Sequence, residues 1–368
     1  MKTKTAVLNG KPDAGNLLCK NLQIVAVLAG VAVCGGCRTA WEVAPDVEQT
    51  VKAGHDATWD EWRKTYPKRY LADTDTVEQQ QALYRELWAH DPAAETRLWP
   101  VGKVPFRTGE TRCRLDITEL WQRNVIVRDV NDPFFVFYPA KGVEKAPVAV
   151  VCPGGGYACM GYNKEGTEIA EWLNSIGFSA AVLLYRVPDQ RKAALADVQR
   201  AVRILRAKPG VYGIDPKKIG VIGFSAGANL TVAAATNWKR KVYERVDEID
   251  DVSCRPDFQL PIYLWDVLPR DPKARMGLPL VGKDVPLAIR AEEYPVDAET
   301  PPAFLSQAED DFCRIETTIA YHLALKRAGV SSEMHVFKSG GHGYGLRRLG
   351  TPCDAWSDLA AKWLSQFR

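Results

Sequence analysis

The chain has 368 residues, of which 46% are hydrophobic, enough to bury a full core in one large domain or in two. Its net charge is +3, with lysine and arginine dispersed along the chain, so nothing indicates a nucleic-acid-binding surface.

Residues 1–37 are typical of an export signal. Four lysines precede an apolar stretch at residues 22–33. A basic segment followed by about a dozen apolar residues is typical of a secretory signal and is too short for a comfortable membrane span. The sequence Gly35-Gly36-Cys37 resembles the end of a bacterial lipoprotein signal, in which Cys37 would carry the lipid. The alternative is an uncleaved anchor helix.

Residues 38–112 are charged and rich in tryptophan, and they contain no catalytic pattern. A helix is predicted over residues 77–90. We expect this segment to be an accessory arm that packs on a main domain formed by residues 113–368. Contact of its tryptophans with carbohydrate is the alternative.

The main domain is predicted to be α/β. Residues 125–127 and 134–138 flank Asn131-Asp132-Pro133 and predict a hairpin. The apolar run at residues 147–152 predicts a central strand covered on both faces. Helix and strand patterns then alternate. The helices are expected at 165–176, around 195–205, at 226–235 and at 315–327, and the strands at 179–185, 217–224, 258–264, 302–307 and 333–337. This alternation predicts a mostly parallel, doubly wound sheet with helices on both faces.

Residues 266–300 interrupt the alternation. They are rich in proline, lysine and arginine and lie between two predicted strands. A long excursion at that place predicts a lid or a substrate-binding insertion. A plain surface loop fits the composition equally well.

Residues 223–227 have the Gly-x-Ser-x-Gly spacing of a nucleophile elbow, with a predicted strand before and a predicted helix after. Ser225 would project from a strained turn, and the flanking glycines would avoid a clash there. The backbone N–H of Ala226, at the helix N-terminus, would face a developing oxyanion. The alternative is a glycine-rich packing turn.

A serine nucleophile needs a base and an acid that holds the base in the correct tautomer. Among the five histidines, His342 alone lies in a glycine-rich loop directly after the last predicted strand, so we predict it as the base. The others precede the sheet or fall within a predicted helix or strand: His55, His90, His322 and His335. The acid should follow the strand at 302–307, where three residues compete: Glu309, Asp310 and Asp311.

Three glycines follow the predicted central strand, at residues 154–156. A phosphate cradle is one interpretation, but no Gly-Lys-Ser/Thr follows and the run does not open a GxGxxG helix. The other is an oxyanion loop, in which Gly155 and Gly156 would donate backbone N–H groups together with Ala226.

Nine cysteines occur, three of them in residues 1–37. Their spacings match no zinc pattern, so we predict no metal. A serine nucleophile with its base and acid needs no cofactor, so none is predicted. Export would permit disulfides, whereas Cys152, at the end of the central strand, is expected to be a buried free thiol.

The region from about Trp99 to Arg368 resembles the bacterial esterase and acetylxylan-esterase branch of the α/β-hydrolase superfamily. The resemblance is carried by seven segments: 98–100, 152–157, 171–177, 185–186, 213–220, 223–227 and 340–347. It implies the α/β-hydrolase fold. It also implies Asp311 as the acid, because residues 312–316 match the stretch that follows the acid in that family. The chain departs from many relatives at Phe312, where they have proline, and at Thr317, where they have asparagine.

The resemblance implies an exported serine carboxylic-ester hydrolase that deacetylates carbohydrate or small acetyl esters through an acyl-enzyme. Such a protein would be periplasmic or on the outer surface, and would contact a membrane only through a lipid at Cys37. One alternative is a serine peptidase of the prolyl-oligopeptidase type, although residues 1–112 are too few for a propeller-length domain. Another is a non-catalytic surface-binding lipoprotein on a hydrolase scaffold, which would be expected to lack members of the triad.

Overall fold

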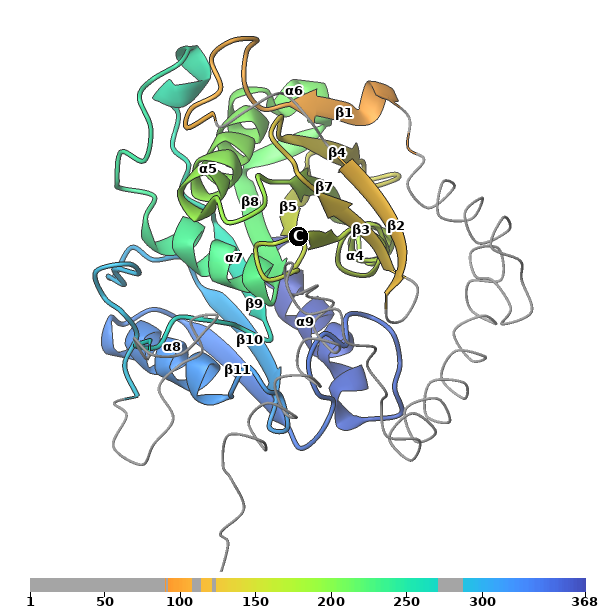
Figure 1. The fold of residues 1–368 in the computed structure, drawn as a ribbon, viewed down its shortest axis with the longest axis vertical. Coiled ribbons are helices and arrows are strands. Elements are labelled where there is room, and N and C mark those ends of the chain that lie inside the picture. Colours follow the sequence, from red (N-terminus) through yellow and green to blue (C-terminus); the bar gives the residue numbers. More distant parts are fainter. Residues whose placement is uncertain (1–89, 91, 108–113, 121–123, 271–286) are drawn as a thin grey trace, which may run out of the picture.

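The computed structural model describes residues 90, 92–107, 114–120, 124–270 and 287–368 (Figure 1). The predicted signal at 1–37 and residues 38–89, 91 and 108–112 of the predicted arm lie outside the described residues. Residues 271–286, the middle of the predicted insertion, also lie outside them.

Eleven strands are assigned within the described residues. They are β1 (Glu95–Arg97), β2 (Arg114–Leu120), β3 (Asn124–Arg128), β4 (Phe134–Tyr138), β5 (Ala146–Cys152), β6 (Met160–Gly161), β7 (Ser179–Leu184), β8 (Ile214–Phe224), β9 (Phe258–Ile262), β10 (Ala303–Ala308) and β11 (Ser332–Phe337).

The α-helices in the same part of the chain are α4 (Glu168–Ser175), α5 (Arg191–Ala207), α6 (Pro209–Tyr212), α7 (Ala226–Thr236), α8 (Glu316–Arg327) and α9 (Trp356–Leu364). A π-helical turn, η2 (Asn163–Thr167), leads directly into α4. Short 3-10 turns are η1 (Pro92–Ala94), η3 (Glu248–Asp251), η5 (Pro352–Ala355) and η6 (Ser365–Phe367). No helix among the described residues is both long and apolar enough to cross a membrane.

The described strands form a large sheet and a small one. The large sheet has the order β1-β4-β7-β5-β8-β9-β10-β11. The central strand β4 of its first three pairs antiparallel with both β1 and β7, and the remaining neighbours, β7-β5-β8-β9-β10-β11, all pair parallel. The small sheet has the order β2-β3-β6 and is antiparallel. The predicted mostly parallel sheet is therefore confirmed.

The predicted hairpin between residues 125–127 and 134–138 is wrong. β3 pairs with β2 and β6 in the small sheet, whereas β4 pairs with β1 and β7 in the large one. Phe134 and Phe135 are buried and lie opposite Leu184 and Leu183 of β7. An apolar strand gains more from pairing inside the covered sheet than from pairing with its neighbour in sequence.

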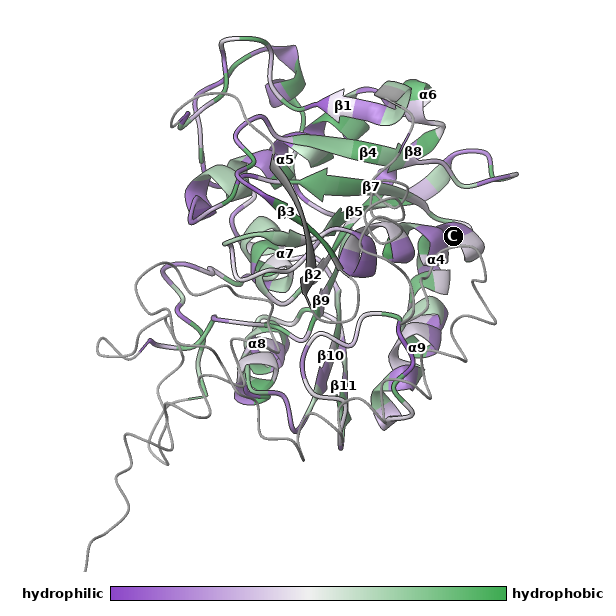
Figure 2. Cartoon of the chain, turned by 45° about the vertical axis from the view of Figure 1, so that its right-hand side comes forward, coloured by the Kyte–Doolittle hydropathy of each residue, from purple (hydrophilic) through white to green (hydrophobic). Residues whose placement is uncertain are grey.

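Helices cover both faces of the large sheet. In Figures 1 and 2, α5, α7 and α8 lie on one face and α4 and α9 on the other. The side chains agree: Val232 of α7 and Leu325 of α8 belong to one buried hydrophobic cluster, and the rings of Trp172 in α4 and Trp356 in α9 lie 5.5 Å apart.

Burial on both faces explains why β5 and β7 consist almost entirely of apolar residues. All seven residues of β5 and all six of β7 are buried, and Figure 2 shows β4 and β7 in the colour of hydrophobic residues. Every residue of the alanine-rich helix α7 is also buried. Small side chains let this helix approach the ends of β5, β8 and β9 closely, which matters for the site below.

A buried carboxylate on α5 binds both Arg186 and Trp99, which lies just after the edge strand β1. Asp197, on α5, is fully buried and lies 2.6 Å from the guanidinium of Arg186. The indole of Trp99 donates a hydrogen bond of 2.9 Å to the same carboxylate. Trp99 is thereby fixed to the core of the main domain.

We predict that Asp197→Ala lowers the free energy of unfolding by about 3–5 kcal/mol, because it leaves Arg186 buried without its counter-charge. Urea denaturation of the purified protein measures the change. Asp251→Ala is the control, since it removes an exposed pair with Arg245 (2.7 Å) and should leave the unfolding midpoint unchanged. Equal midpoint shifts in the two variants would contradict the role given to the buried pair.

Candidate active site

Ser225 occupies the turn between β8 and α7, as the elbow spacing predicts. Its φ is 53° and its ψ is −114°, a conformation that residues other than glycine rarely adopt. Its N–H donates a hydrogen bond of 3.1 Å to the carbonyl oxygen of Ile262 at the end of β9. The turn is thus held by the neighbouring strand.

The two flanking glycines are sterically required. A Cβ on Gly223 would lie 2.1 Å from the carbonyl oxygen of Gly227. A Cβ on Gly227 would lie 1.9 Å from the carbonyl oxygen of Cys152, at the end of β5. The steric reason predicted for these glycines is confirmed.

The fold brings His342 and Asp311 to Ser225. His342 follows β11, Asp311 follows β10 and Ser225 follows β8. The carboxyl ends of these parallel strands meet at one edge of the sheet. Nε2 of His342 lies 2.7 Å from Oγ of Ser225. Nδ1 lies 2.9 Å from each carboxylate oxygen of Asp311. Because a carboxylate only accepts, Nδ1 carries the proton in this network and Nε2 offers its lone pair to the serine.

Asp311 is held from two further sides. Its carboxylate accepts a hydrogen bond of 2.7 Å from the backbone N–H of Cys313 and one of 3.1 Å from Nε2 of Gln307. The hydroxyl of Thr318 donates in turn to the amide oxygen of Gln307. The side chain of Asp311 is fully buried, so these contacts fix its direction toward the imidazole.

The other two acids at this loop have different partners. Oδ1 of Asp310 accepts the N–H groups of Gly340 and Gly341, at 3.0 and 2.8 Å. Glu309 forms an exposed pair with Lys338 at 3.1 Å. Of the three competing acids, only Asp311 is placed against His342.

The remaining histidines within the described residues are engaged elsewhere. His90 pairs with Glu95 at 2.7 Å, and His335 pairs with Glu333 at 2.7 Å. Nδ1 of His322 lies 2.9 Å from the hydroxyl of Ser332. His55 lies outside the described residues.

The glycine loop after β5 lies against the elbow. A Cβ on Gly154 would lie 3.0 Å from the Cβ of Ser225. Gly155 and Gly156 have φ of 143° and 63°. Within the described residues, the N–H groups of Gly155, Gly156 and Ala226 donate to no other protein group, so all three are available to a substrate oxygen.

Glu165 and Tyr263 support this loop, and the sequence analysis missed both. The carboxylate of Glu165 accepts the N–H of Gly154 at 2.7 Å and the hydroxyl of Tyr263 at 2.7 Å. Burial raises the pKa of Tyr263 well above its usual range, and the Glu165 carboxylate adds to the shift, so Tyr263 stays a donor. The Tyr263 ring also meets His342 edge-on, with centroids 5.1 Å apart. In the sequence, Glu165 has no signal beyond that of an acid at a helix start.

The described ends of the predicted insertion are anchored close to the elbow helix. Asp266 is buried and pairs with Arg191, Arg270 and Arg290 at 2.6, 2.9 and 3.2 Å. Its backbone carbonyl accepts a hydrogen bond of 3.0 Å from the amide of Asn229, one turn into α7. That the insertion acts as a lid stays a prediction, since residues 271–286 are outside the described part.

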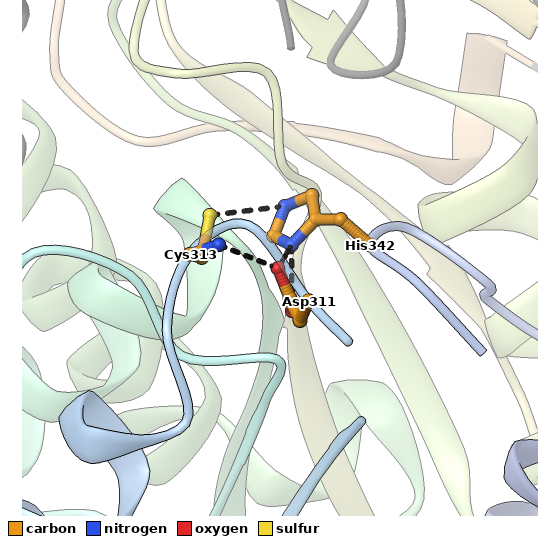
Figure 3. Close-up of side chains that lie close together, drawn as sticks. All are labelled: Asp311, Cys313 and His342. Atoms are coloured by element: carbon orange, nitrogen blue, oxygen red, sulfur yellow. Dashed lines mark hydrogen bonds and ion pairs between the residues drawn. The ribbon is translucent and has the colours of Figure 1, made fainter. Parts of the chain in front are cut away.

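One group of side chains among the described residues has the composition of a metal site. Asp311, Cys313 and His342 offer ligand atoms that lie within 4.8 Å of one another (Figure 3). All five cysteines in this part of the chain are free and buried: Cys152, Cys159, Cys254, Cys313 and Cys353.

Comparison with known proteins places this arrangement in a family. A family model described as BD-FAE matches residues 135–262. An acetylxylan esterase of Xylanibacter ruminicola is 29% identical over 232 residues, which make up 57% of this chain and 43% of that protein. This chain spans less than half the length of the curated relatives it matches.

Solved structures extend the comparison. An acetyl ester-xyloside bifunctional hydrolase from Caldicellulosiruptor lactoaceticus is 30% identical, with a TM-score of 0.58 over 74% of this chain and 95% of that chain. A thermophilic esterase from Thermogutta terrifontis, 19% identical, shares the fold, with a TM-score of 0.53 over 70% of this chain and 94% of that chain. The chain therefore belongs to the esterase-like branch of the α/β-hydrolase superfamily.

Proposed function

We propose that the protein is a serine carboxylic-ester hydrolase that works through an acyl-enzyme. The observation that carries the proposal is the 2.7 Å contact between Nε2 of His342 and Oγ of Ser225, with Nδ1 of the same ring on the buried carboxylate of Asp311. A hydroxyl in this setting can lose its proton as it attacks a carbonyl carbon, which an isolated serine cannot do at neutral pH.

In the proposed reaction Ser225 attacks the ester carbonyl while His342 takes its proton. Asp311 keeps the imidazole in the required tautomer and stabilises the imidazolium that forms. The N–H groups of Gly155, Gly156 and Ala226 would hold the tetrahedral oxyanion, each donor contributing about 10²–10³ in rate. His342 then returns its proton to the leaving alcohol and activates the water that hydrolyses the acyl-enzyme.

We propose an acetyl group on carbohydrate, or a small acetyl ester, as the substrate. The support is that one relative is named as an acetylxylan esterase and another as an acetyl ester-xyloside hydrolase. Fold does not fix substrate, so this part of the proposal rests on those relatives and needs its own measurement.

We also propose that the protein is exported, with a lipid anchor at Cys37. The support is the leader-like sequence of residues 1–37, in which lysines precede an apolar stretch that ends near Gly35-Gly36-Cys37. Labelling of the full chain with a fatty acid in cells, compared with Cys37→Ser, tests the anchor.

A substrate panel tests the proposed activity. We expect the purified wild type to cleave p-nitrophenyl acetate with a higher kcat/KM than the octanoate, to release acetate from acetylated xylan, and to leave a prolyl amide intact. Ser225→Ala should lose this hydrolysis while its thermal unfolding is unchanged, and phenylmethylsulfonyl fluoride should label Ser225 in the wild type only. Preference for the amide would favour a peptidase, and full activity of Ser225→Ala would remove the serine mechanism.

The choice between the adjacent acids gives a sharper test. Asp311→Asn should lower kcat by about 10⁴-fold, because an amide would present an N–H to Nδ1 and select the wrong tautomer of His342. Asp310→Asn keeps an oxygen that can accept the N–H groups of Gly340 and Gly341 and should retain most of the activity. Steady-state kinetics of the two variants decide it. A larger loss in Asp310→Asn would make Asp310 the acid.

Glu165 is predicted to position the oxyanion loop. Glu165→Ala releases the N–H of Gly154 and should lower kcat by about 10²-fold, the size of one lost oxyanion donor, with little change in KM. Glu165→Gln keeps an acceptor for that N–H and should recover much of the rate. Tyr263→Phe, which leaves the Gly154 contact intact, is the matched control and should have the smaller effect. A raised KM at unchanged kcat in Glu165→Ala would instead indicate a binding role.

A further inference from the structure

The thiol of Cys313 lies beside the catalytic imidazole and has no part in the proposed reaction. Its Sγ is 3.7 Å from Nε2 of His342, the atom that faces Ser225 (Figure 3). Cys313 is 1% exposed, its backbone N–H donates to Asp311, and its thiol lies within 4.8 Å of a carboxylate oxygen of the same residue. A sulfur and a nitrogen donor are therefore held side by side at the point where the serine proton must be transferred.

The separation of these donors fits a tetrahedral metal ion. With a Zn–S bond of about 2.3 Å and a Zn–N bond of about 2.0–2.1 Å, a distance of 3.7 Å corresponds to an S–Zn–N angle of about 117°. This lies within about 10° of the tetrahedral angle. The separation of the two donor atoms therefore allows them to share one ion.

Asp311 supplies the support that such a site requires. A metal-binding histidine usually donates its other ring N–H to a carboxylate, which fixes the tautomer and makes the ligand nitrogen more basic. Nδ1 of His342 is in this relation to Asp311, at 2.9 Å from both oxygens. The contacts that prepare Nε2 to accept a proton therefore also prepare it to bind a metal.

Ser225 is placed differently. Its Oγ is 2.7 Å from Nε2, which would give an O–Zn–N angle of only about 80° with bonds of about 2.1 Å. The hydroxyl must rotate away before it can join the same ion. The fixed ligands are thus His342 and Cys313, and water or the displaced serine completes the coordination.

We propose that this site binds Zn²⁺, or another cation that prefers sulfur and imidazole ligands, through Nε2 of His342 and Sγ of Cys313, and that the bound ion blocks the esterase. On binding, the thiol releases its proton to solvent and the metal takes the lone pair that would accept the proton of Ser225. Mg²⁺ and Ca²⁺ prefer oxygen ligands and do not bind here. The inhibition rests on the proposed function, whereas the binding does not.

The test uses the full chain in metal-free buffer, with Co²⁺ as a spectroscopic probe and Zn²⁺ as the inhibitor. The wild type and Ser225→Ala should show a sulfur-to-cobalt charge-transfer band in the near ultraviolet, and Cys313→Val should not. The Zn²⁺ concentration that halves ester hydrolysis, taken relative to the metal-free rate of each variant, should rise by more than about tenfold in Cys313→Val, since even loss of an outer contact costs about 10–100-fold in affinity.

Cys254→Val is the control, because it removes another buried thiol whose Sγ contacts a backbone carbonyl and no histidine. It should keep both the band and the Zn²⁺ sensitivity. Cys313→Ser serves if the valine variant does not fold, and should lose the band while keeping a weak oxygen ligand. A band that persists without Cys313, or equal Zn²⁺ sensitivity in Cys313→Val and the wild type, overturns the proposal. Lack of ester hydrolysis by the metal-free wild type refutes the proposed function and leaves the cobalt band to test the site.

Discussion

The approach of the first turn of α7 to the end of β5 is the constraint on which the site depends. Gly227 leaves no room for a Cβ against the carbonyl oxygen of Cys152, which would lie only 1.9 Å away. That contact brings the loop that follows β5 against the elbow, so that Gly154 lies beside the Cβ of Ser225. A larger residue at Gly227 would separate the nucleophile from the N–H groups of Gly155 and Gly156, which we propose to hold the same substrate oxygen. Nucleophile and oxyanion loop are thus set by a single backbone contact.

Around this contact, three acids fix backbone as well as side chains. Asp310 accepts two N–H groups of the loop that carries His342, and Glu165 accepts the N–H of Gly154 from the opposite side. Asp311, next in sequence to Asp310, points toward the imidazole instead. Glu165 and Asp311 are buried, and each satisfies donors that would otherwise be buried without partners, whereas Asp310 is exposed. The three acids thus fix three parts of the site: the loop that carries His342, the imidazole itself and the glycine loop after β5.

The parts that the sequence predicts well are those determined over a short range. The central strand, the turn around Ser225 and the loop of His342 follow from apolar runs and glycine spacing, and the structure has all three at the expected positions. The acid of the site cannot be chosen from such local patterns, because Glu309, Asp310 and Asp311 are adjacent acids that differ only in which residues the fold places opposite them. The resemblance to esterases singled out Asp311, and the residues alone did not.

The errors and omissions concern partners that are distant in the chain. The hairpin expected between residues 125–127 and 134–138 fails because β4 finds its partner in β7, about fifty residues later. Glu165 went unnoticed because its partner Tyr263 is 98 residues away. Contacts between residues so far apart in the chain do not change the local composition. A pattern of glycines and apolar residues therefore cannot reveal the β4–β7 pairing or the Glu165–Tyr263 hydrogen bond.

The contact between Cys313 and His342, which are also distant in sequence, is explained by the pairing of two strands. A metal site was not expected because the cysteine spacings match no zinc pattern, yet the relevant pair is a cysteine and a histidine 29 residues apart. Their meeting follows from the register of β10 and β11, which run parallel and place Ala308 opposite Phe337 at their last paired positions. Cys313 is five residues beyond the first (308 to 313), and His342 is five residues beyond the second (337 to 342). Two loops that leave adjacent parallel strands at the same level meet above the same sheet edge, and where they meet the thiol lies 3.7 Å from Nε2.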